Sequence, residues 1–370
     1  MKVNFDEKRA REVFQILENG WQRRNGIFNG IVLPQDRWDA PVDNREHANW
    51  LFYTALPMRG GIMSEEPFKW MWKLKQRFPE LFEPAEIAGK WTLEKMKEAF
   101  IEVTAEILNG NGVGEMGAGA LSWNMDEHIR AWHKNSVVLS RYWGSDIRNI
   151  FWGVTEFEEA FRRVDHYHVE TGFKGMRRKI FSLLTIWLQE RNLIPLFPTP
   201  IPIDFHALRI LWGTEVLKLN GLAKPFNPAS YQAEQLRGKT ALRISEKFMD
   251  AIAKWSQKFI HKSGFSHMNI NPAIWVLSRS MCSEHVQTSS KKDGSLYAKA
   301  DLLKNVSAWP KKYKDPCSYC PVEKWCKWAI PAAPYYRWGM LVRAGKRVLY
   351  PVMKLPGLGE FFNSRRNKRR

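Results

Sequence analysis

The sequence predicts a mainly α-helical protein, and three observations lead to this fold class. Apolar residues recur at three- and four-residue spacing over most of the chain. Alternating apolar and polar patterns, typical of strands, are almost absent. The chain has 370 residues, of which 44% are hydrophobic. It can therefore bury a large core and form two helical domains or one elaborated domain.

The N-terminal half contains seven expected helices separated by two loops. In the first, residues 4–24, the apolar Val13, Leu17 and Trp21 recur at helical spacing. The others are expected at residues 46–56, 65–78, 92–108, 124–143, 146–152 and 155–166. Residues 25–45 carry glycines and prolines, and residues 109–120 are glycine-rich without the Gly-Lys-Ser/Thr ending of a phosphate-binding loop. We expect both segments to be loops.

The C-terminal half contains four further expected helices, at residues 175–191, 205–219, 228–262 and 270–281. Between the first two lie four prolines in eight residues, from Pro195 to Pro202, which force an extended segment. Asp204 follows as the expected N-cap of the next helix. Residues 283–316 are polar and carry seven lysines, and the chain ends in a run of arginine and lysine that we expect to be disordered and to favour polyanions.

The charge of the chain is strongly positive. Lysine and arginine number 57 against 38 acidic residues, a formal net charge of +19. Such an excess favours a polyanionic partner, although a merely basic protein or one bound to a ribosome or membrane surface would also fit. No apolar run approaches the ~20 residues of a membrane span, so we expect no membrane partner.

All four cysteines lie near the end of the chain, with the spacing Cys-x34-Cys-x2-Cys-x5-Cys: Cys282, Cys317, Cys320 and Cys326. Four thiolates suit a tetrahedral zinc site or a 4Fe–4S cluster. Two disulfides are the other interpretation. The chain opens without the pattern of a signal peptide, so we expect a reducing compartment, where clustered cysteines indicate metal. Zinc sites favour two Cys-x2-Cys pairs, whereas this chain has one such pair, followed by an x5 spacing. We therefore expect iron–sulfur, with zinc as the alternative.

Two short stretches upstream carry further signals. By itself, Asp204 is explained as a plain N-cap worth about 1 kcal/mol. Residues 172–179, Gly-Phe-Lys-Gly-Met-Arg-Arg-Lys, form a glycine turn that leads into a basic helix. The amides at such a helix start can hold a phosphate.

The order of these pieces resembles the helix-hairpin-helix base-excision DNA glycosylases of the endonuclease III type. Residues 203–209, Ile-Asp-Phe-His-Ala-Leu-Arg, match the aspartate, histidine and arginine of that family's Val-Asp-Thr-His-Val-x-Arg fingerprint. The last two cysteine spacings are those of the family, and the first is expanded. In the family's hairpin, Leu-Pro-Gly-Val-Gly-Arg-Lys, the first glycine aligns with Gly175, while Arg177 replaces the second.

The resemblance implies a function and a set of site residues. A base would be flipped out of the duplex, and Asp204 would drive hydrolysis of its N-glycosidic bond. Lys179 falls at the family's Schiff-base lysine and would add lyase activity. The four cysteines would hold a structural 4Fe–4S cluster. DNA contacts would come from the hairpin and from the lysine-rich segment, namely Gly175, Arg177, Arg178, Lys291, Lys292, Lys311 and Lys312.

The resemblance also implies a domain plan. It places an N-terminal helix and loop at 1–45, packing on the C-terminal domain, and a helical domain with a degenerate hairpin at 46–190. The domain with the catalytic-aspartate helix and cluster would span 191–330, and a basic extension 331–370. The expected protein is a monomer on double-stranded DNA, at the nucleoid of a cytoplasm or in a nucleus.

Three alternatives stay open. The chain could be a nucleic-acid-binding relative without catalysis, or a relative that acts on RNA or on modified bases. It could also be a nuclease of the iron–sulfur type. That class needs a Glu/Asp-x-Lys metal site on the strands of an α/β core, and the sequence contains no such strand pattern.

Overall fold

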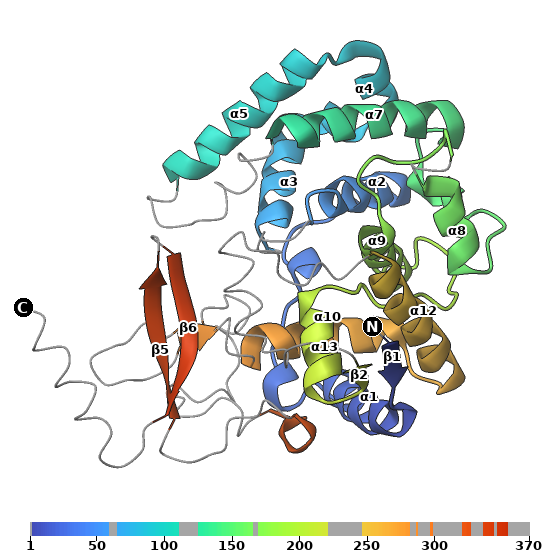
Figure 1. Cartoon of the computed structure of the whole chain (residues 1–370). Coiled ribbons are helices and arrows are strands. Elements are labelled where there is room, and N and C mark those ends of the chain that lie inside the picture. Colours follow the sequence, from blue (N-terminus) through green and yellow to red (C-terminus); the bar gives the residue numbers. More distant parts are fainter. Residues whose placement is uncertain are drawn as a thin grey trace, which may run out of the picture. The chain divides into compact units, whose positions relative to one another are not determined.

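A computed structural model describes residues 2–58, 65–110, 125–165, 169–220, 246–281, 286–287, 297–298, 320–326, 336–343 and 346–353. Within these ranges the chain is mainly helical, as predicted (Figure 1). Contacts between residues divide the chain into two compact units. Unit 1 comprises residues 1–31, 203–252 and 259–370, and unit 2 comprises residues 32–202 and 253–258.

Unit 2 is a helical bundle built around helix α2, Asn44–Ala55. Every side chain from Ala48 to Ala55 is buried, because α3, α9 and two 3-10 helices pack around α2. The other helices of the unit are α3 Glu65–Arg77, α4 Pro84–Lys90, α5 Leu93–Gly110, α7 Met125–Trp143, α8 Phe157–Val164 and α9 Arg178–Glu190. Its 3-10 helices are η2 Pro34–Asp36, η3 Pro79–Phe82 and η4 Ile147–Phe151.

Aromatic rings fill the centre of unit 2. Tyr53 of α2 stacks on Trp132 of α7 with 4.3 Å between ring centroids and an interplanar angle of 9°. The hydroxyl of Tyr53 shares a hydrogen bond of 2.7 Å with Ser136, and burial raises the pKa of this tyrosine above its usual range. Phe52 meets Phe173 edge to face at 5.0 Å. The contacts of Tyr53 join α2 to α7, and the contact of Phe52 joins α2 to the turn before α9.

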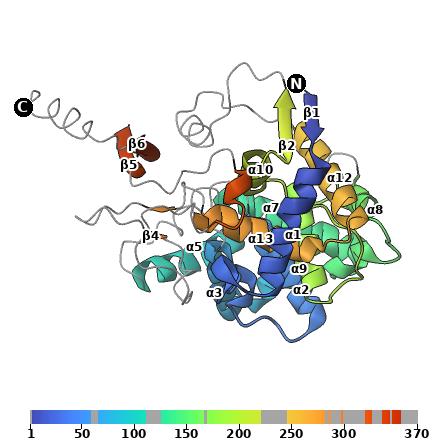
Figure 2. The same cartoon turned by 90° about the horizontal axis from the view of Figure 1, so that it is seen from below.

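Unit 1 combines residues from the start of the chain with residues from its second half, blue beside orange in Figure 2. Helix α13, His267–Met281, packs on α1, Glu7–Gln22, and on α10, Phe205–Gly213. Strand β1, Lys2–Phe5, pairs antiparallel with β2, Leu217–Asn220. Helix α12, Glu246–Lys262, belongs mostly to unit 1, but its residues Ala253–Lys258 group with unit 2. The remaining elements of unit 1 are η1 Gly26–Phe28, β3 Val286–Gln287, β4 Tyr297–Ala298, η7 Glu323–Trp325, β5 Tyr336–Arg343 and β6 Lys346–Met353.

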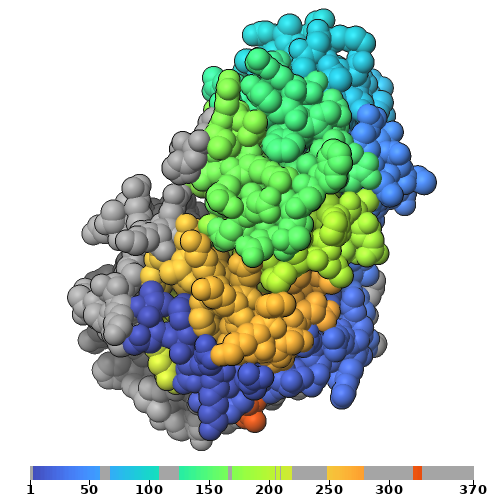
Figure 3. All heavy atoms as spheres, turned by 90° about the vertical axis from the view of Figure 1, so that its right-hand side faces the viewer, coloured from blue at the N-terminus to red at the C-terminus, as the bar shows by residue number. Residues whose placement is uncertain are grey.

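The N-terminal residues lie beside helix α13 in unit 1, blue beside orange in Figure 3. A carboxylate from α1 contributes to this packing. Oε1 of Glu18 accepts hydrogen bonds from the backbone amide of Ser266 at 2.7 Å and from Nδ2 of Asn269 at 3.3 Å. Both donors lie at the N-terminus of α13, where a negative charge is favourable.

Two local predictions differ from the structure. The helix predicted at 205–219 ends at Gly213, because Thr214 caps it and Glu215 takes a positive φ of 60° before β2 begins. The stretch predicted as a helix at 146–152 is the short 3-10 helix η4, which starts after its N-cap Asp146.

Candidate functional site

The α8–α9 pair forms a helical hairpin in unit 2. Gly175 lies in the connecting turn with a φ of +85°, a conformation that glycine adopts without strain. The amide of Phe173 donates to the carbonyl of Val164 at 3.0 Å, which closes the turn against the end of α8. Helix α9 then starts with the bond from the amide of Phe181 to the carbonyl of Arg177 at 2.9 Å.

The basic residues of the hairpin have different surroundings. Arg177 is exposed, and its side chain makes no capping hydrogen bond to α9. Arg178 pairs with Glu158 of α8 and lies over the ring of Phe161, with 4.6 Å from its guanidinium carbon to the ring centroid. The guanidinium of Arg178 therefore joins α8 to α9.

Lys179 is half-buried and contacts the turn that follows α2. Its Nζ donates a hydrogen bond of 3.2 Å to the backbone carbonyl of Met58. The two residues are 121 positions apart in the sequence, and both belong to unit 2. Lys179 therefore joins the start of α9 to the turn that follows α2.

No pattern in the sequence predicted the role of Asn135, which lies inside α7. Its Nδ2 donates to the carbonyl of Lys174 at 3.0 Å, and its Oδ1 accepts from the amide of Lys174 at 2.7 Å. The side chain is completely buried. The signal in the sequence that could have indicated this role is an asparagine on the apolar face of a predicted helix, because a buried side-chain amide needs hydrogen-bond partners.

Asp204 lies in unit 1 at the N-terminus of α10, where the sequence predicted an N-cap. Its Oδ1 accepts hydrogen bonds from the amides of His206 at 2.9 Å and Ala207 at 3.1 Å. Nδ1 of His206 shares a hydrogen bond of 3.0 Å with Oγ of Ser278, which lies on α13. The helix that starts at Asp204 is thus tied to the helix that leads to Cys282.

The proline segment before Asp204 is held in unit 2 by two glutamines. Gln189 of α9 donates to the carbonyl of Phe197 at 3.1 Å and accepts from the hydroxyl of Thr199 at 3.1 Å. Gln257 donates to the carbonyl of Pro198 at 2.8 Å. These bonds satisfy backbone groups that the prolines leave outside any helix or strand.

Two of the four cysteines, Cys320 and Cys326, lie in the described part of the chain. They are half-buried at the two ends of a compact turn, in which the amide of Cys326 donates to the carbonyl of Glu323 at 2.9 Å. Nε1 of Trp325 donates to Glu12 of α1 at 2.8 Å, which anchors this turn in unit 1.

Other predicted site residues lie outside the described residues: Cys282, Cys317, Lys291, Lys292, Lys311 and Lys312. Within the described ranges, no three histidine, cysteine or acidic side chains converge as a metal site. The four-cysteine cluster thus stays a prediction.

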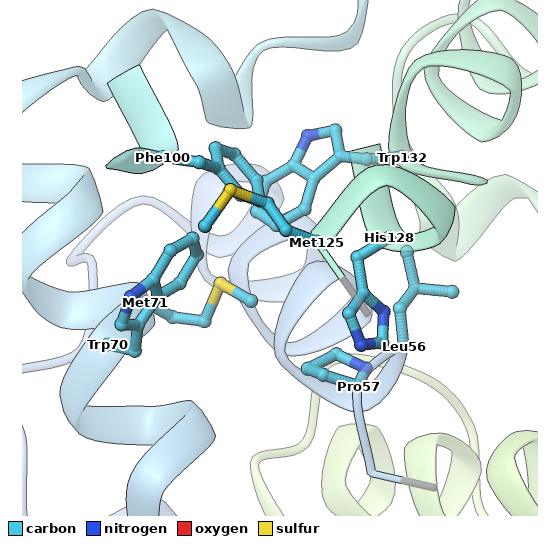
Figure 4. Close-up of a pocket in the computed structure, with 8 residues that line it drawn as sticks. All are labelled: Leu56, Pro57, Trp70, Met71, Phe100, Met125, His128 and Trp132. Carbon is cyan, nitrogen blue, oxygen red and sulfur yellow. The ribbon is translucent and has the colours of Figure 1, made fainter. Parts of the chain in front are cut away.

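A small cavity lies among α2, α3, α5 and α7 of unit 2 (Figure 4). Two tryptophans line the cavity, and the indole nitrogen of each donates a hydrogen bond to a residue outside the lining. Nε1 of Trp70 donates to the hydroxyl of Thr104 at 3.2 Å, and Nε1 of Trp132 donates to the carbonyl of Leu81 at 2.9 Å. Its volume of about 10 Å³ is the room of a single water molecule. The cavity is therefore too small for a nucleobase in this conformation.

Comparison with known proteins adds no family: no family model and no curated protein matches this chain. In the part of the chain that the structure describes, no helix is both long enough and apolar enough to span a membrane.

Proposed function

We propose that the chain is a base-excision DNA glycosylase, which flips a damaged or modified base and hydrolyses its N-glycosidic bond. The observation that carries this proposal is the α8–α9 hairpin, in which a glycine at positive φ leads into a helix that starts with Arg178 and Lys179. The first amides of such a helix can bind a phosphate. A net charge of +19 supports a double-stranded DNA partner, and we propose a monomer at the nucleoid or in a nucleus.

Asp204 is the proposed catalytic carboxylate. Its two amide hydrogen bonds fix the orientation of the carboxylate at the start of α10. In this role it stabilises the positive charge that develops on the sugar and orients or deprotonates the attacking water, as carboxylates do in glycoside hydrolysis. His206 and Ser278 support the helix that carries Asp204.

Lys179 is the proposed nucleophile of an additional lyase reaction. In this reaction its neutral amine, in place of water, would form a bond to C1′ of the sugar, and the base would leave with the electrons of the bond that breaks and take up the proton that the amine releases. Opening of the sugar ring, whose oxygen takes a proton from water, then produces a protonated Schiff base. The hydrogen bond from its Nζ to the carbonyl of Met58 favours this role, because it holds the amine in one position.

A 4Fe–4S cluster is the proposed cofactor, held by Cys282, Cys317, Cys320 and Cys326, with zinc as the alternative. The donor set fits either group, because two of the thiols sit at the ends of one compact turn and thiolates bind iron and zinc. When bound, the cluster supplies a rigid shape to this part of the chain. The lysines at 291, 292, 311 and 312 would then neutralise phosphates.

Base release from a panel of duplexes with damaged or modified bases tests the proposal. We expect the wild-type protein to release at least one base and Asp204→Asn to lose this activity by about a hundredfold or more, as for removal of a general acid or base. Borohydride should trap a covalent complex that Lys179→Ala does not form. Equal release by wild type and Asp204→Asn would contradict the glycosylase proposal.

A second candidate function is nucleic-acid binding without catalysis. The observation that favours it is that Asp204 serves as an N-cap, a structural role that needs no reaction. In this case wild type and Asp204→Asn would bind duplex DNA equally, and neither would release a base from any member of the panel.

A further inference from the structure

We propose that Asn135 is a positioning residue that holds the hairpin turn in the conformation that presents the first amides of α9 to a nucleic-acid backbone. This inference rests on the proposed function, since it names a residue outside the hairpin on which DNA binding depends. Neither the motifs of the sequence nor the family resemblance points to Asn135.

The geometry of the contact carries the inference. One side-chain amide of α7 binds both backbone groups of Lys174, with 2.7 Å from the amide nitrogen of Lys174 to Oδ1 and 3.0 Å from Nδ2 to its carbonyl oxygen. Lys174 directly precedes Gly175, the residue at positive φ. The clamp therefore acts at the point where the chain reverses between α8 and α9.

The chemistry of the clamp requires an asparagine. A carboxamide presents a donor and an acceptor on one rigid group, so that it can satisfy a backbone amide and a backbone carbonyl together. Asn135 is completely buried, and loss of the side chain would leave both groups of Lys174 without this partner. Buried backbone groups without partners are costly, so the turn would move to find others.

The turn needs such support because it contains a single glycine between Phe173 and Lys179. The amides of the first helical turn lie along the helix axis, so their direction depends on where the preceding turn is held. A displacement of Lys174 would rotate the start of α9 and weaken any phosphate contact made by these amides. Their contact with a phosphate thus depends on Asn135.

The chain offers a matched control in Asn49, which makes the same type of clamp elsewhere in unit 2. Its Nδ2 donates to the carbonyl of Ser145 at 2.9 Å, and its Oδ1 accepts from the amide of Ile147 at 3.1 Å. It is equally buried. Asn49 holds the turn between α7 and η4 and not the hairpin, so its loss should cost stability without changing the presentation of α9.

The experiment compares Asn135→Ala, Asn135→Asp and Asn49→Ala with the wild type in the full chain. Hydrogen exchange over residues 169–181 measures the hairpin without DNA, and anisotropy with a fluorescein-labelled short duplex measures affinity over a range of salt concentrations. We expect both alanine variants to lower Tm, but only Asn135→Ala to speed hairpin exchange. It should lower duplex affinity by about tenfold with a shallower salt dependence, because phosphate contacts are lost.

The outcomes distinguish failure of the proposed nucleic-acid function from failure of the role proposed for Asn135. If the wild type does not bind the duplex, both the nucleic-acid function and this role of Asn135 fail. If the wild type binds but Asn135→Ala binds equally well or leaves hairpin exchange unchanged, Asn135 is not a positioning residue and the proposed function stands. Asn135→Asp keeps the acceptor for the amide of Lys174, and its neutral acid form, which burial favours, can also donate to the carbonyl, so this variant should fold even if the alanine variant does not. Its effect should be smaller than that of alanine and should grow as the pH rises, because the carboxylate that forms faces the carbonyl of Lys174 without a proton to donate. Wild-type exchange and affinity in this variant at every pH would also overturn the inference.

Discussion

At the residue scale, single polar side chains hold the turns on which the candidate site depends. Asn135 binds the backbone of Lys174, and Asp204 binds the first amides of α10. The sequence predicted the capping role of Asp204, because an N-cap acts on residues two and three positions ahead. It did not predict the role of Asn135, whose partner lies 39 positions away.

His267, the first residue of α13, should make the stability of unit 1 sensitive to acid. Burial lowers the pKa of this histidine to about 4 from its model-compound value of 6.5. The unfolded chain therefore binds the proton more tightly, and the free energy of unfolding should fall as the pH drops from about 6.5 toward 4. Above this range the group contributes no pH dependence.

Chemical denaturation at several pH values checks this prediction. His267→Gln should show a smaller loss of stability over that pH range than the wild type. His261→Gln, which changes an exposed histidine of α12, serves as the control and should keep the wild-type slope. The same slope in all three proteins would show that His267 does not carry the effect.

At the element scale, the sequence predicted where helix α10 starts, but tertiary contacts decide where it ends. Helix α10 ends at Gly213, because Val216 accepts a hydrogen bond of 2.9 Å from the amide of Asp6 and the next residues pair with β1. The apolar periodicity of residues 205–219 continues past this point, so a local pattern predicted a longer helix.

Two helical glycines should respond in opposite ways to alanine. A Cβ on Gly20 of α1 would lie 2.7 Å and 2.9 Å from two ring atoms of Phe28, whereas a Cβ on Gly89 of α4 would have no heavy atom within 4 Å. Gly20→Ala should therefore destabilise the protein by about 1–3 kcal/mol through overpacking. Gly89→Ala should stabilise it by about 0.5–1 kcal/mol, because alanine favours the helix.

Urea unfolding of both variants measures these differences, and each serves as the control for the other. The prediction for Gly20 would be wrong if Gly20→Ala were as stable as the wild type. Such a result would mean that the buried ring of Phe28, which also meets Trp21 at 5.9 Å, moves without cost.

At the scale of the whole molecule, the proposed four-cysteine cluster would link distant parts of the sequence. Helix α13 packs on α1 and leads to Cys282, while the turn from Cys320 to Cys326 is anchored on α1 through Glu12. Helix α1 therefore contacts both parts of the chain that supply the predicted ligands.

Metal analysis of the purified protein tests the proposed cluster. We expect about four iron atoms per chain and a broad visible absorbance, as for a 4Fe–4S cluster. Cys320→Ser should lose most of the iron and lower Tm, because the cluster stabilises the fold that binds it. Ser318→Ala changes the same stretch without removing a thiol and should keep the wild-type iron content. A colourless protein with one zinc would contradict the prediction.

The sequence by itself determined the helical fold, the start of α10 at Asp204 and the basic character of the chain, because these depend on the spacing of neighbouring residues and on composition. The tertiary structure decided which distant groups meet. It paired Arg178 with Glu158, placed Lys179 on the carbonyl of Met58 and held Lys174 with Asn135. Such contacts depend on how helices pack in space, and no local pattern records that packing.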